Sequence, residues 1–187
     1  MKFTKKAVQK GFTIIELMIV LAIISILIGG VIVGLQMMDD TKASSAARDS
    51  SVSITALKLK YRNIGTTAAV TTTNAIAGNV FPSSMDWVAG GTTVNNQAGG
   101  AVTVVPATIV SANDAFLLSE DGFKSSQCQK YIGSIFPNVK KIVVTPTGGA
   151  ATTVYSTYGT VVALSPPTID AACSGSSNLI AMTFAKN

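Results

Sequence analysis

The chain begins with a short basic stretch followed by an almost uninterrupted apolar segment. From Leu17 to Leu35 the sequence contains no charged residue, and the apolar character extends to Met38. About 20 such residues are enough to cross the hydrocarbon core of a bilayer as a helix. The hydrophobic pattern therefore predicts a membrane-inserting helix over residues 12–38.

A second hydrophobic pattern indicates that the helix continues beyond Met38. Residues 39–61 contain no Gly or Pro, and Gly65 is a suitable C-terminal stop. Small or apolar residues recur there in alternating steps of four and three, which is one stripe of a helix: Ala43, Ala47, Ser50, Ile54, Leu57, Tyr61 and Ile64. We therefore expect one helix from Phe12 to Tyr61, about 75 Å long. Gly29, Gly30 and Gly34 would either allow close helix–helix approach or let the helix stretch, and both readings stay open.

The pattern after the helix predicts mainly loops and strands. Segment 65–113 is rich in Thr, Ala, Gly and Asn and is expected to form a long irregular connection. Its anchors would be Phe81-Pro82 and Trp87-Val88, with short β pieces at 101–105 and 108–110. Low charge favours packing of this segment on the domain over disorder.

The C-terminal part alternates β-branched or aromatic runs with Gly, Pro and Ser. A strand at 115–118 is expected to end in the turn Glu120-Asp121-Gly122, and a helix capped by Ser125 or Ser126 to end at Pro137. Further strands are expected at 142–145, 152–157, 160–164 and 179–184. The predicted fold class is α+β, with a long N-terminal α-helix packed against an antiparallel β-sheet.

Composition narrows the chemistry that the chain can perform. It has 187 residues, of which 14 are basic and 9 acidic, so there is room for one domain beyond the helix. Four lysines lie within residues 1–11, and without them 14 − 4 = 10 basic and nine acidic residues remain, a net charge of +1. That balance gives no signal for nucleic-acid binding. The chain has no His and no metal-ligand spacing, phosphate loop or nucleophile arrangement, so we expect no enzyme, cofactor or metal.

The two cysteines, Cys128 and Cys173, lie in the part of the chain that would be translocated. An even pair in an oxidising compartment predicts a disulfide. A catalytic thiol would need a base nearby, and the chain offers no His for that role. We therefore expect Cys128 and Cys173 to be joined.

The single charge inside the apolar segment, Glu16, sets it apart from an ordinary targeting signal. A carboxylate at the edge of such a run is costly unless something pairs with it. A secretory signal peptide would have a shorter apolar core and an A-x-A-like cleavage site, which is absent here. A plain signal anchor explains neither Glu16 nor Gly11. The lysines of residues 1–11 place the N-terminus in the cytoplasm.

These residues resemble the N-terminus of a type IV prepilin. The motif of that family is a basic leader ending in Gly, an apolar residue next, and Glu at the fifth mature position, which Gly11, Phe12 and Glu16 match. The resemblance implies cleavage after Gly11 by a prepilin peptidase, N-methylation of Phe12 and insertion in the bacterial inner membrane. Assembly machinery in that membrane would then polymerise copies of the chain into an extracellular pilus. The chain would comprise a leader (1–11), an apolar helix (12–38) and a globular head (39–187).

The C-terminal part resembles the larger, type IVb class of pilins. The resemblance is carried by residues 115–122, Gln127-Cys128, Ile135-Phe136-Pro137 and a second cysteine shortly before the last strand. It implies a structural pilus subunit that serves adhesion, aggregation or motility. Two other functions stay open: a minor pilin or type II secretion pseudopilin, and a monomeric membrane-anchored adhesin that would keep residues 1–11.

Glu16 is the residue that we expect to carry assembly. After cleavage Phe12 would present a positive amine, which N-methylation preserves, and Glu16 of a neighbouring subunit could neutralise it. An unpaired buried charge costs several kcal/mol, so this pairing would select one axial register. The alternative is an acid that reaches the membrane interface without a partner. Asp39-Asp40, the first charges after the apolar run, are expected to form a solvated exit from the membrane.

Overall fold

The computed structural model describes residues 12–186, apart from the side chains of Ile32 and Val33. The chain divides between Met38 and Asp39 into two compact units, which are described separately here. The second unit, 39–187, is called the head below. Gly11, the predicted last residue of the leader, lies outside the described residues together with the rest of segment 1–11.

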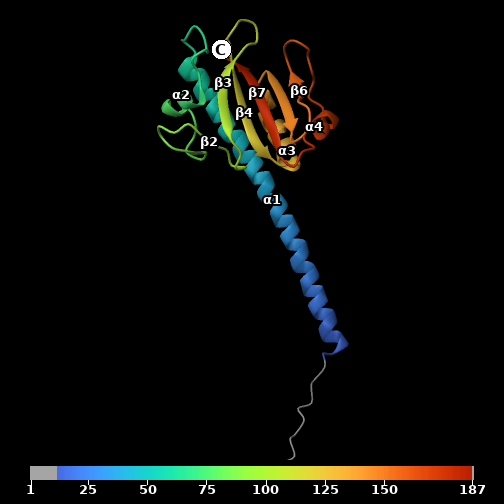
Figure 1. The fold of residues 1–187 in the computed structure, drawn as a ribbon. Helices are drawn as coiled ribbons and strands as arrows, with labels where there is room; N and C mark the ends of the chain where they lie inside the picture. The colour runs from blue at the N-terminus through green and yellow to red at the C-terminus, as the bar shows by residue number, and fades with distance from the viewer. Residues whose placement is uncertain (1–11, 187) are drawn as a thin grey trace, which may run out of the picture. The chain divides into compact units, whose positions relative to one another are not determined.

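Helix α1 (Ile14–Tyr61; Figure 1) is continuous across the end of the apolar segment. It begins two residues later than expected because Thr13 acts as its N-cap. The Thr13 hydroxyl oxygen accepts a hydrogen bond of 3.3 Å from the backbone N–H of Glu16, which satisfies one of the free donors of the first turn. The prediction of one helix that reaches Tyr61 is confirmed.

Within the head, α1 packs through the predicted stripe. Five stripe residues are buried: Ala43, Ala47, Ser50, Ile54 and Leu57. Tyr61 is partly buried, and its ring centroid lies 6.0 Å from that of Phe116. Ile64 was wrongly included in the stripe, since the helix ends at Tyr61 and the Ile64 side chain is 45% exposed. The stripe therefore buries α1 over four turns of the helix.

The head is built on a five-stranded antiparallel sheet with the order β3-β4-β7-β5-β6 (Figure 1). Its strands are β3 (Val102–Ala107), β4 (Ala115–Phe123), β5 (Lys141–Pro146), β6 (Thr152–Ser156) and β7 (Asn178–Ala185). The last strand, β7, lies in the centre, where Met182 pairs with Leu118 of β4 and with Ile142 of β5. Strands β1 (Asp86–Trp87) and β2 (Val94–Asn95) form a separate two-stranded sheet.

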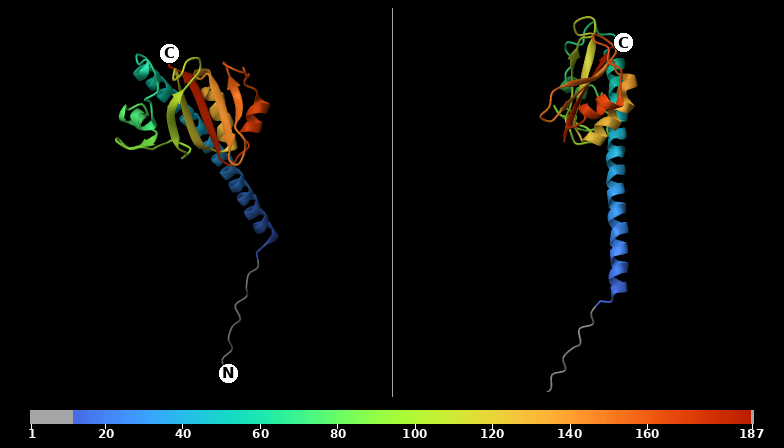
Figure 2. Two further views of the ribbon diagram at one scale, coloured as in Figure 1. Left: turned by 45° about the horizontal axis from the view of Figure 1, so that its top comes forward. Right: turned by 90° about the vertical axis from the view of Figure 1, so that its right-hand side faces the viewer.

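Helix α3 (Ser125–Ile135) and the head portion of α1 cover the same face of the sheet, as the two views of Figure 2 show. The short helix η1 (Phe136–Asn138) follows α3, so α3 ends before Pro137. Neither Ser125 nor Ser126 is the N-cap of α3. That position is Lys124, whose backbone N–H donates to Gln127 Oε1 at 3.1 Å.

Two short α-helices were not expected from the sequence. Helix α2 (Thr72–Ala77) lies against β3 and is capped by Thr71, whose hydroxyl oxygen accepts from Asn74 N–H at 3.2 Å. The connection 65–113 is therefore not wholly irregular. Helix α4 (Pro166–Ala172) packs beside β5, β6 and α3.

Strand β4 continues through Glu120-Asp121-Gly122, where a turn was predicted. The turn prediction is wrong because the break in this segment is a β-bulge, with a register shift between Glu120 and Phe123. Gly122 has φ +87°, and a Cβ there would come within 2.8 Å of the Gly100 backbone. Glycine thus marks a bulge inside the strand and not its end.

Two other predicted strands are absent from the part of the chain that the structure describes. Segment 160–164 makes only one bridge, between Val162 and Ser156. In segment 108–110 the backbone N–H groups of Ile109 and Val110 donate to the Asp114 carboxylate, at 2.7 and 2.9 Å. A side chain thus satisfies the donors that a neighbouring strand would otherwise use.

Candidate functional site

The first candidate site is the apolar segment at the start of α1. Every described side chain from Phe12 to Met38 is exposed, and Phe12 is 82% exposed. By length and composition this part of α1 could cross a membrane. An exposed apolar surface of this extent marks an interaction with lipid or protein, because soluble monomers rarely present one.

Phe12 and Glu16 lie at the beginning of that segment. Phe12 precedes the helix, whereas Glu16 lies in its first turn, where a negative side chain is favoured by the helix dipole. Among residues 12–186 no cation lies within ion-pair distance of the Glu16 carboxylate. Pairing of Glu16 with Phe12 of another copy therefore stays a prediction, as do the roles of Gly11 and Phe12 in processing.

Gly29, Gly30 and Gly34 are all helical. A Cβ added at any of the three would meet no neighbouring atom within 4 Å in the described chain. Nothing within one subunit therefore requires a glycine at these positions. Close approach of another helix and stretching of α1 both remain predictions.

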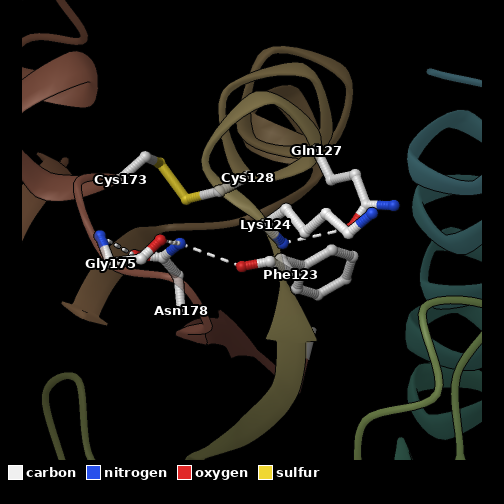
Figure 3. Close-up of a disulfide and its surroundings, with 7 residues drawn as sticks. All are labelled: Phe123, Lys124, Gln127, Cys128, Cys173, Gly175 and Asn178. Carbon is white, nitrogen blue, oxygen red and sulfur yellow. Dashed lines mark hydrogen bonds between the residues drawn. A yellow bond between two sulfur atoms is a disulfide. The ribbon is translucent and has the colours of Figure 1, made fainter. Parts of the chain in front are cut away.

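The second candidate site surrounds the disulfide, which the structure forms between Cys128 and Cys173 (Figure 3). Cys128 lies on α3 and Cys173 directly follows α4, with their Cα atoms 5.8 Å apart. Both cysteines are fully buried. The predicted disulfide is confirmed, and it joins the two helices that cover neighbouring parts of the head.

Asn178 ties the chain after the disulfide to the end of β4 (Figure 3). Its Nδ2 donates to the carbonyl oxygens of Phe123 and Gly175, at 2.9 and 3.0 Å, and its Oδ1 accepts from Gly175 N–H at 3.1 Å. The Asn178 side chain is buried, so these bonds satisfy groups that water cannot reach. The start of β7 is thereby held close to the disulfide.

Asp39 and Asp40 are the first head residues of α1, and Asp40 is exposed. Asp39 is partly buried, accepts from Gln127 Nε2 at 3.0 Å and forms an ion pair of 3.2 Å with Lys124. Asp40 lies 3.5 Å from the ammonium of Lys130. A solvated exit from the membrane stays a prediction, and the partners of the two acids, all from α3 or its cap, are distant in sequence. The two acids attach the first head residues of α1 to α3.

A buried carboxylate, Glu120, lies between α1, α3 and the sheet. Glu120 Oε1 accepts from Ser50 Oγ and, at 3.0 Å, from Tyr131 OH, and its Oε2 accepts from Asn96 Nδ2 at 3.2 Å. Desolvation raises the pKa of Glu120 to about 7, an effect that the three donors partly oppose and the nearby Asp49 charge reinforces. Burial, followed by the charge of Glu120, also raises the pKa of Tyr131 well above its usual value.

Sequence reasoning missed this cluster because it assigned Glu120 to a turn. A signal was available, since Phe116, Leu118 and Glu120 follow the period of two that places alternate strand residues on one face. Extending that alternation by one step would have placed Glu120 in the core. Its donors could not have been found in this way, because Ser50, Asn96 and Tyr131 come from three distant segments.

Comparison with known protein families identifies the family of this chain. Residues 6–32 match the prokaryotic N-terminal methylation motif. Residues 48–185, most of the chain, match the family described as PilS N terminal. The chain is a type IV pilin of the PilS N-terminal family.

Known pilins resemble this pilin in sequence and in fold. The toxin coregulated pilin of Vibrio cholerae is 32% identical over 145 residues, covering 72% of this chain. This chain spans 63% of the length of that pilin. The crystal structure of TcpA, a type IV pilin from the El Tor biotype of Vibrio cholerae, matches with a TM-score of 0.52 at 19% identity, covering 79% of this chain and 99% of TcpA.

A second solved structure shows the same pilin fold. The type IV b pilin from Salmonella typhi matches with a TM-score of 0.52 at 12% identity, covering 78% of this chain and 98% of that pilin. The predicted fold class, a long N-terminal helix on an antiparallel sheet, is confirmed, and the chain resembles the type IVb class. The relatives are pilins and not enzymes.

Proposed function

We propose that this pilin is the structural subunit of a type IV pilus. The chain would enter the bacterial inner membrane as a prepilin, lose residues 1–11 by cleavage after Gly11, and become N-methylated at Phe12. Copies would then polymerise into a cell-surface filament used for adhesion, aggregation or motility. One observation carries the proposal: the methylation motif at 6–32 opens a helix whose described side chains are all exposed as far as Met38.

The exposed apolar segment fits a subunit that is surrounded by lipid before assembly and by other subunits after it. A helix that is apolar on every side must be surrounded, either by lipid or by other helices. Before assembly the bilayer would cover residues 12–38. In the filament, residues 12–38 of neighbouring copies would cover them instead. Exchange of lipid contact for protein contact brings little net gain in free energy per residue. Apolar packing alone would therefore tolerate several axial registers.

Glu16 would select among those registers. In the correct register its carboxylate would meet the Phe12 amine of a neighbouring copy, whereas every other register would bury two unpaired charges. The Glu16 side chain supports this role, because no cation among residues 12–186 forms an ion pair with it. The processing partners would be a prepilin peptidase that also methylates Phe12 and the inner-membrane machinery that adds subunits.

The mature N-terminus provides the direct test of this function. We expect protein from sheared cell-surface filaments to begin at N-methylated Phe12, as measured by mass spectrometry, and electron microscopy to show filaments. The Gly11→Leu variant should remain uncleaved, because a large side chain is unsuited to a position where the peptidase accepts Gly. Protein that begins at Phe12 in spite of Gly11→Leu would contradict the reading of the leader. Filaments in which this chain is a rare component would identify a minor pilin instead.

A further inference from the structure

A positively charged pocket opens on the head between α1 and the segment that leads from η1 to β5. It has a volume of about 330 Å³, and its lining contains Lys58 and Lys140 but no acidic residue. Asn138 Nδ2 donates to Ser51 Oγ at 3.1 Å and so connects the two sides of the pocket. The pocket is therefore a defined feature of the folded head, and its formal charge is +2.

Neither lysine forms an ion pair with another described residue of its own subunit. Among residues 12–186 the two ion pairs use Lys124 and Lys130 instead. The Lys58 ammonium lies 5.9 Å from the centroid of the Phe184 ring, which positions the cation without cancelling its charge. Lys140 is exposed. Two unpaired cations that line one pocket form a site for an anionic group.

One acid of the head has the complementary property. Asp170, on α4, is exposed and has neither an ion pair nor a side-chain hydrogen bond among the described residues of the head. The other acids of the head are buried or have partners: Asp39, Asp40, Asp49, Asp86, Asp114, Glu120 and Asp121. Asp170 also lies in the last turn of α4, where the helix dipole disfavours a negative charge.

We propose that the Asp170 carboxylate of one copy binds between Lys58 and Lys140 of a neighbouring copy. This contact rests on the filament function proposed above and names a head-to-head surface of that filament. Asp170 lies on α4, beside β6 (Figure 1), and is not part of the pocket lining. When such a contact between two different surfaces is used head to tail, it is heterologous and gives rings if the rotation closes and open helical filaments if it does not.

The free energy expected for this ion pair fits a contact that is weak by itself and is repeated along the filament. An exposed ion pair contributes at most about 1 kcal/mol. The pocket volume leaves room for ordered water beside the carboxylate, which can complete the hydrogen bonds of the two ammonium groups. Because each subunit contributes one pocket and one Asp170, every subunit added to the filament could gain this term. The contact would supplement the register set by Glu16.

The disulfide has a role in this contact. Cys173 directly follows α4 and is bonded to Cys128 of α3, so the bond fixes the position of the helix that presents Asp170. Loss of the disulfide should therefore weaken the head contact as well as the fold of the head.

Carbodiimide cross-linking of unchanged, sheared filaments tests the contact directly. The reagent joins a carboxylate to a touching ammonium as an amide, and it takes up the released water to become a urea. We expect a peptide linking Asp170 to Lys140 or Lys58 in the cross-linked dimer band, identified by mass spectrometry. The Asp39–Lys124 pair, 3.2 Å apart within one subunit, serves as the positive control. Recovery of the control link without a link from Asp170 to either lysine would overturn the inference.

Charge reversal provides the second measurement. Asp170→Lys and Lys140→Glu should each lower the ratio of filament to processed membrane subunit by about three- to tenfold, and their combination should restore most of it. Matched controls are Asp86→Lys, since Asp86 already faces Asn95 at 3.5 Å, and Lys141→Glu, since the Lys141 ammonium lies 6.0 Å from the Tyr158 ring and outside this pocket. Equal effects of the variants and their controls would overturn the inference.

The two proposals fail in different ways in these experiments. If the unchanged chain forms no filaments, the proposed function is wrong and the head contact is wrong with it. If filaments form normally but Asp170 is neither cross-linked nor sensitive to charge reversal, only the head contact is wrong. The amount of processed, disulfide-bonded subunit in membranes shows whether each variant folds.

Discussion

Helix α1 contains two segments that share a secondary structure and differ in everything else. In residues 14–38 every described side chain is exposed, and nearly all are apolar. In residues 39–61 a stripe of small and apolar residues is buried against the sheet, while other faces carry charges such as Lys42 and Arg48. One continuous helix thus changes from an exposed surface to a packed one within the length of a few turns.

The difference shows that helix formation and burial have separate causes in this chain. Backbone hydrogen bonds continue through both segments because no proline interrupts them. Burial depends on the pattern of side chains, since one sheet can cover a single stripe but cannot cover a helix that is apolar on all sides. The second segment is therefore satisfied within the subunit, whereas the first requires lipid or other subunits.

The largest effect is expected from removing the only charge of the first segment. Glu16→Ala should leave insertion and cleavage largely intact but lower filament yield at least about tenfold, because the Phe12 amine would be buried unpaired. Glu16→Gln should behave similarly, since it keeps the size and loses the charge. The measurement compares processed subunit in membranes with subunit in sheared filaments. Normal yield from Glu16→Ala would rule out the pairing, and loss of the processed subunit itself would place Glu16 in an earlier step.

Removal of the disulfide should affect the head and spare the first segment. Replacing Cys128 and Cys173 by Ser opens a loop whose ends are 45 residues apart and should lower the free energy of unfolding by about 4 kcal/mol in the chain-entropy model. Denaturant titration of the detergent-solubilised full chain measures this change. Membrane insertion should be unchanged. Two free thiols found by alkylation of unreduced, unaltered protein would contradict the prediction.

Substitutions of three leucines on α1 allow buried and exposed positions of one helix to be compared. Leu57 is fully buried, whereas Leu59 is 62% exposed and Leu21 is 55% exposed. Leu57→Ala should lower the free energy of unfolding of the head by about 2–5 kcal/mol, because it leaves a cavity in the core. Leu59→Ala and Leu21→Ala should change it by less than about 0.5 kcal/mol. A comparable loss in Leu59→Ala would show that the two faces of α1 are not distinguished by burial.

The smallest effect is a pH dependence of the free energy of unfolding. It arises from Glu120 of β4, which accepts a hydrogen bond from Ser50 in the second segment of α1. Because the Glu120 pKa is raised to about 7 in the folded state, the folded chain keeps a proton that the unfolded chain loses above its usual pKa of 4.5. The free energy of unfolding should therefore fall as pH rises from about 4.5 to about 7, by at most roughly 3 kcal/mol.

Glu120→Gln is the control for this pH dependence, since it cannot ionise. Its free energy of unfolding should change less over that range than the free energy of the unchanged chain, as measured by denaturant titration at several pH values. The same decline with pH in both chains would show that groups other than Glu120 cause it.

The periodic elements could be predicted from the sequence, and the irregular ones could not. The length of α1, its stripe and the cysteine pair follow from patterns that extend over many residues. Helix α4, the Val162 bridge and the bulge at Gly122 depend on contacts with distant segments. Short elements of this kind have too few residues for a periodic signal, so tertiary contacts decide them.

By itself the sequence determined that residues 12–38 form an apolar segment, helical from Ile14, with one acid, because hydrophobicity and spacing are properties of neighbouring residues. It also determined which face of residues 39–61 would be buried. Only the tertiary structure decided that Glu120 lies in the core and that Asp39 and Asp40 bind α3. It also decided that Lys58 and Lys140 share a pocket that lacks an acid. Charged groups are satisfied by partners brought together in space, and local sequence does not reveal which distant residues those partners are.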